Sequence, residues 1–231
     1  MIEPREPALE NTDTWLVVPL YNESSVIFDV ISEALLTFPK IVCVDDGSTD
    51  SSAERAEQAG AYVVRHPINL GQGAALQTGF DYVARDSAAR FAVTFDSDGQ
   101  HLAADAARMV ERLRHEELDV ILGSRFLDNR TNASPMKRAV LKLAVKFTNV
   151  TTGVRLSDAH NGLRAFTVEG LAKIRVRQNR MAHASEIVAQ IGRTRLRYAE
   201  EPVHIVYTDY SRSKGQSLWN SVNILVELIL K

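Results

Sequence analysis

Two aspartates separated by one residue, Asp96 and Asp98, follow an apolar run in the stretch FAVTFDSDGQH (91–101). In an extended chain, residues i and i+2 point to the same side, so the two carboxylates converge if the strand continues through them. At about 5 Å and an effective dielectric constant of about 20, their mutual repulsion is about 3 kcal/mol. A nearby cation would offset that energy, and a solvated turn at Asp98–Gly99 is the alternative explanation.

The cation expected beside these carboxylates is a divalent metal. The stretch itself contains no lysine or arginine, the six histidines are scattered along the chain, and the single cysteine, Cys43, cannot form a thiolate zinc site. Carboxylate oxygens are ligands that suit Mg²⁺ or Mn²⁺. The sequence therefore predicts a magnesium or manganese site at Asp96 and Asp98.

Two other polar stretches also follow apolar runs. In VDDGSTD (44–50), carboxylates such as Asp46 could accept hydrogen bonds from ribose hydroxyls or a base N–H, or could serve as a turn and helix cap. The stretch NLGQGAALQTGF (69–80) resembles a phosphate loop, but it lacks the lysine of a Walker A motif. It also has Leu76 where a dinucleotide-binding fingerprint has its third glycine, which argues against a Rossmann dehydrogenase.

The elements that must position these residues alternate between strand and helix. Short apolar runs predict strands at 15–20, 40–46, 61–66, 91–96 and 119–124. Helical spacing and caps predict helices at 23–38, 48–60, 73–85 and 103–115. This alternation indicates an α/β fold with a mostly parallel sheet and helices on both faces. Ligands bind at the carboxyl ends of the strands in such sheets, where the polar stretches lie.

The alternation loosens after Arg125. We expect helices at 134–147 and 181–192, paired strands within 196–210 and an apolar helix at 217–231. The first of these helices carries a basic stripe at every fourth residue, formed by Arg138, Lys142 and Lys146. That stripe and the last helix suggest contact with a membrane surface or an integral-membrane partner, and packing on the protein's own domain is the alternative.

Composition narrows the function classes. A formal net charge of −2 gives no overall attraction to nucleic acid, so we expect no nucleic-acid partner. Residues 1–13 lack the basic and apolar regions of a secretory signal, and no apolar run reaches the roughly 18 to 20 residues of a membrane span. We therefore expect a cytoplasmic protein, peripheral at the inner face of the membrane.

Five stretches taken together, VVPLYNES, VDDGSTD, NLGQGAALQTGF, FDSDGQH and GSRF, resemble an inverting family 2 glycosyltransferase of the GT-A fold. The similarity runs from about Trp15 to Phe166 and is greatest to the dolichol- or polyprenyl-phosphate mannosyltransferase-like branch. It implies a Rossmann-like, mostly parallel sheet with an elaborated C-terminal acceptor region. It also implies transfer of a sugar from a UDP or GDP donor to a polyprenyl or dolichyl phosphate, with Mg²⁺ or Mn²⁺ as cofactor.

The resemblance assigns roles to individual residues. It implies that Asp96 and Asp98 hold the metal, with Gln100 as a neighbouring ligand. The full set of expected substrate-binding residues is Pro19, Tyr21, Glu23, Val44, Asp46, Asp96, Ser97, Gln100, Arg125, Arg164, Arg212 and Lys214. It also implies one domain over 14–231 behind a flexible tail at 1–13, with a nucleotide-sugar half at 14–126 and an acceptor half at 127–231.

The expected catalytic residues are Asp98, Asp158 and Arg125. A hydroxyl acceptor needs a general base whereas a phosphate is already ionised, and Asp158 is the candidate base. Arg164 could hold an acceptor phosphate, and its alternative is a surface cation. His183 and Glu186, three residues apart on one helix face, could approach the acceptor or pair with each other.

Three rival functions remain open at this point. One is transfer to a saccharide hydroxyl in polysaccharide or glycolipid synthesis, which would need the base. Another is a nucleotide-sugar-binding module without catalysis. The third is a nucleotidyltransferase, which would release pyrophosphate from a nucleoside triphosphate.

Overall fold

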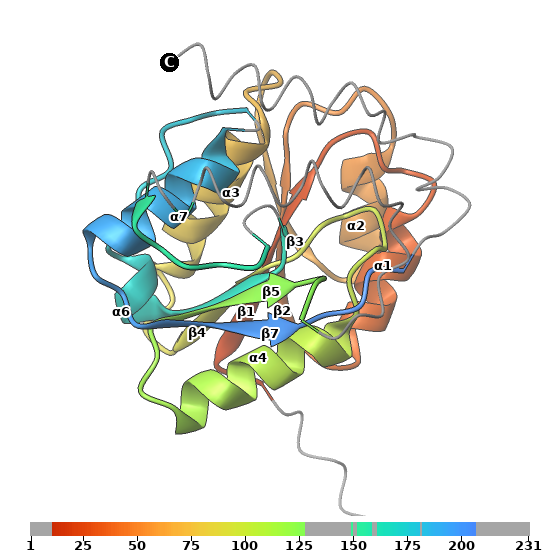
Figure 1. Ribbon diagram of the computed structural model, residues 1–231. Helices are drawn as coiled ribbons and strands as arrows, with labels where there is room; N and C mark the ends of the chain where they lie inside the picture. The colour runs from red at the N-terminus through yellow and green to blue at the C-terminus, as the bar shows by residue number, and fades with distance from the viewer. Residues whose placement is uncertain (1–10, 128–148, 150–151, 159–160, 181, 207–231) are drawn as a thin grey trace, which may run out of the picture.

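One twisted sheet forms the centre of the molecule (Figure 1). The computed structural model describes residues 11–127, 149, 152–158, 161–180 and 182–206. Over these residues the sheet has seven strands in the order β3-β2-β1-β4-β6-β5-β7. Their bounds are β1 Thr14–Leu20, β2 Lys40–Asp45, β3 Tyr62–Arg65, β4 Phe91–Thr94, β5 Val120–Ser124, β6 Arg164–Thr167 and β7 Tyr198–Pro202.

Most neighbouring strands are parallel, as predicted. β1 pairs in parallel with both β2 and β4, β2 with β3, and β5 with β7. β6 is the exception, because it lies antiparallel between β4 and β5. Of the paired strands expected within 196–210, the structure shows β7, which pairs with β5, and residues 207–210 lie outside the described residues.

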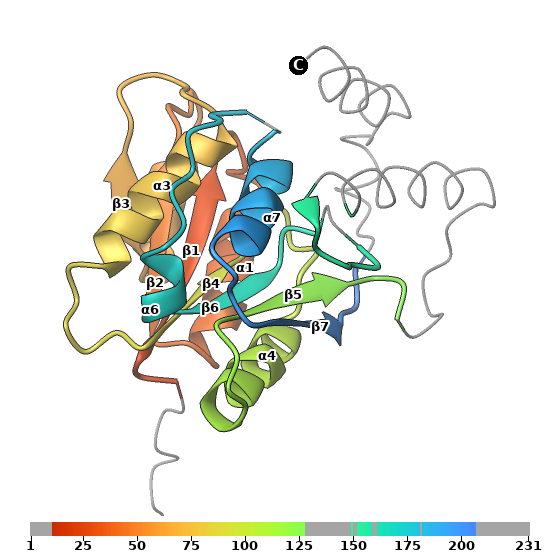
Figure 2. The ribbon, with the colours of Figure 1, turned by 60° about the vertical axis from the view of Figure 1, so that its left-hand side comes forward.

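Helices cover both faces of the sheet, and the two layers are seen best in Figure 2. The first layer consists of α1 (Ile27–Leu35), α2 (Ser52–Ala59) and α4 (Ala103–His115). The second consists of α3 (Gln72–Val83), α6 (Val168–Leu171) and α7 (His183–Arg193). β1 shows why both layers form, since its alternate side chains, such as Val17 and Val18, enter opposite cores.

The sheet brings its polar loops to one edge. Because β1, β2 and β4 are parallel, the segments after Leu20, Asp45 and Thr94 all leave the sheet at the same end. β6 runs the other way, so its first residue, Arg164, lies at this same edge opposite Thr94. The Thr94 hydroxyl donates to the Gly162 carbonyl at 2.6 Å and accepts from the Arg164 N–H at 3.1 Å.

The two expected halves therefore share one sheet, since β6 from the C-terminal part lies between β4 and β5. No helix in the described residues is both long enough and apolar enough to cross a bilayer. The stripe at Arg138, Lys142 and Lys146, and the helix expected at 217–231, lie outside the described residues. Most of the expected tail also lies outside them.

Candidate active site

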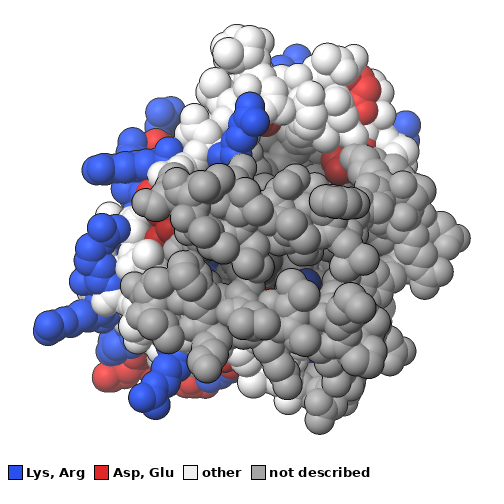
Figure 3. All heavy atoms as spheres, turned by 45° about the horizontal axis from the view of Figure 1, so that its top comes forward, with Lys and Arg blue, Asp and Glu red and all other residues white. Residues whose placement is uncertain are grey.

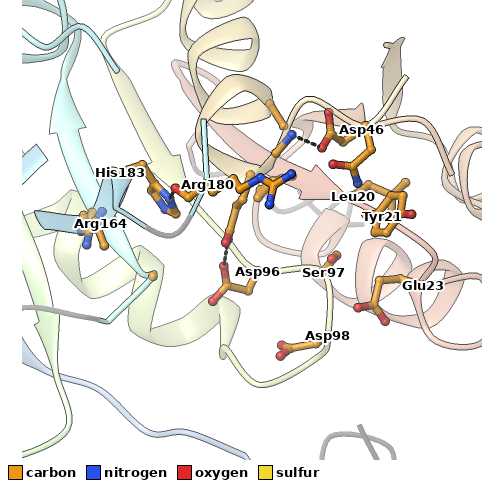
Figure 4. A pocket seen from close by; sticks show the side chains of 17 residues that line it. Leu20, Tyr21, Glu23, Asp46, Asp96, Ser97, Asp98, Arg164, Arg180 and His183 are labelled. Atoms are coloured by element: carbon orange, nitrogen blue, oxygen red, sulfur yellow. Dashed lines mark hydrogen bonds between the residues drawn. The ribbon is translucent and has the colours of Figure 1, made fainter. Parts of the chain in front are cut away.

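A cavity of about 530 Å³ opens at the carboxyl edge of the sheet. The residues that line it come from the end of β1 and the loops after β1, β2, β3 and β4, from α3 and the start of α7 with the segment before it, and from the start of β6. They are Pro19, Leu20, Tyr21, Glu23, Asp46, Asn69, Gly71, Gln72, Ala75, Asp96, Ser97, Asp98, Gly162, Arg164, Arg180, His183 and Ala184. Figure 4 shows Arg164 and His183 at one end of the cavity, Tyr21 and Glu23 at the other, and Asp96 between them.

Asp96 is held from two sides. His101, itself buried, places its Nε2 2.8 Å from Asp96 Oδ2, and Gln72 donates from Nε2 to Oδ1 at 3.4 Å. Loss of bulk water opposes ionisation of Asp96, but the hydrogen bond to His101 and the favourable electrostatics of His101, His183 and Arg164 together keep its pKa below the usual value. Asp96 is therefore ionised at neutral pH, and 31% of its side chain remains exposed toward the cavity.

Asp98 lies in a less favourable environment for a negative charge. Removal from water raises its pKa to about 6, and repulsion from Asp96 adds to the rise, although the Gln100 N–H donates to Asp98 Oδ1 at 3.0 Å. The negative charge of Asp96 is thus partly offset, whereas that of Asp98 is disfavoured by its surroundings. A divalent cation between the two carboxylates would remove this cost.

The donor set fits such an ion when a substrate supplies the remaining ligands. Among the described residues, no group of three or more His, Cys, Asp and Glu side chains is placed to hold a metal. Mg²⁺ is commonly bound by one or two carboxylates together with substrate phosphates. Asp96 and Asp98, both lining the cavity, meet that requirement.

Asp46 organises the loop between β3 and α3. Its Oδ2 accepts from the Gly71 N–H at 2.7 Å, and its Oδ1 accepts from the Leu70 N–H at 2.9 Å and lies 2.8 Å from His66 Nδ1. Gly71 has a φ of +103° and packs against the carbonyl of Asn179, so a side chain there would be excluded both by conformation and by contact. This loop forms the wall of the cavity beside the start of α3.

Basic side chains occupy the opposite end. Arg164 is 2% exposed, and burial lowers its pKa to about 10, so it remains a cation at neutral pH. The Nε atom of Arg164 is buried and has no hydrogen-bond partner among the residues that the structure describes. Burial, and then repulsion by Arg164, lower the pKa of His183, whose Nδ1 lies 2.8 Å from the Arg180 carbonyl. His183 is therefore neutral, with Nδ1 as the donor.

The structure gathers eight of the expected site residues in the cavity wall. They are Pro19, Tyr21, Glu23, Asp46, Asp96, Ser97, Asp98 and Arg164. Val44 does not join them, because its side chain is fully buried in the core under α3. Gln100 is outside the wall, and its N–H bond to Asp98 is its link to the site. Arg212 and Lys214 lie outside the described residues.

Asp158 and Arg125 form a pair away from the cavity wall. Arg125 donates from Nε to Asp158 Oδ2 at 2.6 Å and from Nη2 to Oδ1 at 2.9 Å, and its backbone N–H adds a third bond. Asp158 is almost fully buried. Each of its oxygens thus accepts a hydrogen bond from the Arg125 side chain, and a role for Asp158 as a general base stays a prediction. Glu186, the partner considered for His183, instead accepts from the backbone N–H groups of residues 177 and 178.

Sequence reasoning missed three polar residues of the wall, which are Asn69, Gln72 and Arg180. Asn69 and Gln72 belong to the stretch NLGQG, whose glycines were a usable signal even though the phosphate-loop tests failed. Arg180 had no local signal. It reaches the cavity because the segment before α7 packs on α3, where the Gly73 N–H donates to the Asn179 carbonyl at 2.8 Å.

An α/β sheet with paired carboxylates in a cavity at its carboxyl edge is the arrangement of a GT-A glycosyltransferase. Residues 15–175 match the model of glycosyl transferase family 2, and the chain belongs to that family. Solved structures agree on the fold. The glucosyl-3-phosphoglycerate synthase of Mycobacterium tuberculosis, in complex with Mn²⁺ and UDP-glucose, superimposes with a TM-score of 0.66 at 21% identity, covering 94% of this chain and 78% of that one.

Sequence relatives extend over nearly the whole chain. An uncharacterized protein of Methanocaldococcus jannaschii is 32% identical over 228 residues, covering 96% of this chain and 93% of that protein. The UDP-N-acetylglucosamine–dolichyl-phosphate N-acetylglucosaminyltransferase of Methanococcus voltae is 28% identical over 238 residues, with 94% of each chain covered. The predicted family and fold are confirmed, and the chain is a family 2 glycosyltransferase.

Proposed function

We propose that this glycosyltransferase moves a sugar from a UDP or GDP donor to a polyprenyl phosphate, with Mg²⁺ or Mn²⁺ held by Asp96 and Asp98. The observation that carries the proposal is the layout of the cavity. Carboxylates lie at its centre, a buried cation, Arg164, lies at one end, and Tyr21 and Glu23 lie at the other (Figure 4). The relative from Methanococcus voltae is named for a dolichyl-phosphate acceptor, which agrees with this assignment.

The nucleotide occupies the end formed by the loops after β1 and β2. Tyr21, 45% exposed, offers an aromatic face for a base, and Glu23 offers carboxylate oxygens for N–H or hydroxyl groups. The diphosphate then lies against Asp96, Ser97 and Asp98, and the bound metal stabilises the charge of the departing nucleoside diphosphate. Gln72 and His101 keep Asp96 in place for this purpose.

The acceptor phosphate occupies the end formed by β6 and α7. Arg164 is a buried cation there, and its Nε makes no hydrogen bond within the described part of the chain, so it can donate one to the phosphate. A phosphate oxygen attacks the anomeric carbon, the bond from that carbon to the diphosphate breaks, and its electron pair remains on the diphosphate. No proton has to be removed from the acceptor, which is consistent with an Asp158 whose two oxygens both accept from the Arg125 guanidinium, a pairing that weakens a carboxylate as a base. A saccharide hydroxyl would need a base, and this engagement is why we favour the phosphate.

The proposal also covers the location of the enzyme in the cell and the roles of basic residues outside the described part of the chain. A lipid acceptor requires access to a membrane, so we place the enzyme at the inner face of a membrane as a peripheral protein. Arg212 and Lys214 are proposed to close over the donor phosphates. Arg138, Lys142 and Lys146 stay predicted contacts to the membrane or to a membrane partner.

The first test is the thermal stability of the purified protein with UDP, GDP, TDP and CDP, each with and without Mn²⁺. A ligand at a hundredfold excess over its dissociation constant adds about 2.7 kcal/mol to the free energy of unfolding. We expect a Mn²⁺-dependent rise in Tm with UDP or GDP that Asp98→Ala abolishes. Asp29→Ala, which removes an exposed acid on α1, is the control and should leave the rise intact.

The second test is transfer of labelled sugar from the matching donor to undecaprenyl phosphate. Formation of a lipid-linked sugar with release of nucleoside diphosphate supports the proposal. Nucleotide binding without transfer to the lipid phosphate, but with transfer to a saccharide, would contradict the acceptor assignment. Release of pyrophosphate from a nucleoside triphosphate would contradict the reaction class.

A further inference from the structure

Positive charge is concentrated in one segment of the chain. Residues 173–197 contain seven lysines and arginines and one acid, Glu186, whereas the whole chain has a net charge of −2. We call the seven cations the basic face. They are Lys173, Arg175, Arg177, Arg180, Arg193, Arg195 and Arg197.

The fold turns these cations outward. Before α7, Ile174 and Val176 are 4% and 6% exposed and pack in the core, so the cations that alternate with them point to solvent. After α7 the same alternation recurs around Leu196, which is 4% exposed. Figure 3 shows Lys and Arg side chains gathered on the side of the molecule where α7 lies in Figure 1.

Neighbouring acids neutralise part of this surface. Arg175 contacts Asp81 at 2.8 Å, and Arg197 contacts Glu117 and Asp119 at 3.2 Å. The Glu186 carboxylate accepts backbone N–H bonds from residues 177 and 178. Counting all four acids against the basic face still leaves an excess of three positive charges.

The basic face has two arms, residues 173–180 before α7 and residues 193–197 after it, and both contribute to a small cavity. It has a volume of about 240 Å³ and is lined by Arg175, Arg177, Glu186, Gln190 and Arg193. Gln190 fixes the first arm to α7, because its side chain donates to the Arg175 carbonyl at 2.6 Å and accepts from the Arg175 N–H at 2.7 Å. Three guanidinium groups around a space of this size are suited to a phosphate group.

We propose that the basic face docks on an anionic lipid bilayer, with the cavity between its arms receiving a headgroup phosphate. The inference rests on the proposed function, because it explains how the catalytic cavity could reach an acceptor that is embedded in a membrane. Arg180 belongs both to the basic face and to the wall of the catalytic cavity, and α7 contributes residues to both cavities. The basic face therefore borders the catalytic cavity on its Arg180 side, and docking through it places that side of the cavity next to the membrane surface.

The experiment is co-sedimentation of the full chain with vesicles of phosphatidylcholine alone and of phosphatidylcholine mixed with phosphatidylglycerol. We expect binding to the mixed vesicles that falls as salt is raised. Each arginine near an anionic surface contributes about a fivefold change in affinity, so R177Q/R193Q/R195Q should bind about a hundredfold more weakly. The matched control, R55Q/R65Q/R90Q, removes three exposed arginines that do not belong to the basic face and should keep the affinity of the unaltered chain.

Three results would overturn the inference. They are the absence of binding to the mixed vesicles, an equal loss in both triple variants, and arginine-dependent binding of single-stranded RNA or inorganic phosphate without vesicle binding. The Mn²⁺-dependent rise in Tm with UDP or GDP is measured in parallel and should survive in R177Q/R193Q/R195Q. If vesicle binding is seen as expected and that rise is absent from the unaltered chain, the proposed function fails instead. A rise lost in the triple variant would assign these arginines to the donor site and overturn the docking role.

Discussion

Gly162 packs directly against the carboxylate that we assign to the metal. A Cβ added to it would overlap Asp96 Oδ2 and would lie 2.8 Å from Oδ1 and 2.9 Å from Cγ. Ordinary contact begins near 3.4 Å, so in Gly162→Ala the carboxylate must move by more than half an ångström. Because it is the end of a side chain facing the cavity, it can turn aside at little cost to folding.

Metal binding is affected far more than folding. A shift of this kind moves Asp96 away from His101 and from the geometry it shares with Asp98. Losing the support that orients a ligand lowers metal affinity by about 10- to 100-fold. We therefore expect the Mn²⁺-dependent Tm rise with UDP or GDP to require about 10 to 100 times more Mn²⁺ in Gly162→Ala. The free energy of unfolding without ligand should change by less than about 1 kcal/mol.

The control is another buried glycine, Gly79 on α3, where a Cβ would overlap Val17 in the core. Gly79→Ala should lower the free energy of unfolding by about 1 to 3 kcal/mol and leave the Mn²⁺ requirement unchanged. Chemical denaturation and a Mn²⁺ titration of the Tm separate the two effects. If Gly162→Ala needs no more Mn²⁺ than the unaltered chain, Asp96 does not hold the metal.

Three further changes probe other parts of the site and fold. Asp158→Ala leaves Arg125 without its bidentate partner, so we expect the free energy of unfolding to fall by about 3 kcal/mol in denaturant titrations. Asp46→Ala releases the loop before α3, and we expect nucleotide affinity to fall at least tenfold by calorimetry. Asp86 bonds Lys40, which with other hydrogen bonds lowers its pKa from 3.8 to about 2. Its stabilisation, about 1 kcal/mol after solvent screening, is present above pH 3.8 and lost as the pH falls through about 2. Asp86→Asn should therefore be less stable at pH 6 and equally stable near pH 2.

Each of these three substitutions has a control or an outcome that would contradict its prediction. The double variant with Arg125→Ala and Asp158→Ala should regain part of the stability lost in the single one, and no recovery would contradict a paired interaction. Asp46→Ala should keep its secondary structure by circular dichroism, and unchanged nucleotide affinity would show that the loop does not contribute. An Asp86→Asn deficit that persists at pH 2 would mean that charge is not its cause.

Much of the fold was readable from local sequence. Alternating apolar runs and helical spacing placed the strands before Arg125, and α4 has the predicted bounds, Ala103–His115. Gly60 ends α2 in the left-handed conformation that glycine adopts readily. The paired aspartates Asp96 and Asp98 could also be placed from the sequence, because parallel strands bring the loops that follow them to one edge.

Other features depended on contacts between distant residues. Val44 could not be assigned by its neighbours alone, since a strand residue faces either the ligand or the core, and here it packs under α3. Asp158 and Arg125 are 33 residues apart, and their pairing arises from the way the chain returns to the end of β5. Arg180 reaches the cavity through the packing of its segment on α3.

The sequence by itself determined the alternating elements, the parallel sheet and the paired aspartates, because these follow from residue spacing and strand direction. Only the tertiary structure decided that β6 enters the sheet antiparallel between β4 and β5. Its four residues carry too weak a local signal, and their pairing energy comes from hydrogen bonds to strands far away in the chain. That insertion buries Arg164 in the cavity wall with the carboxylates, which excludes the alternative of a surface cation.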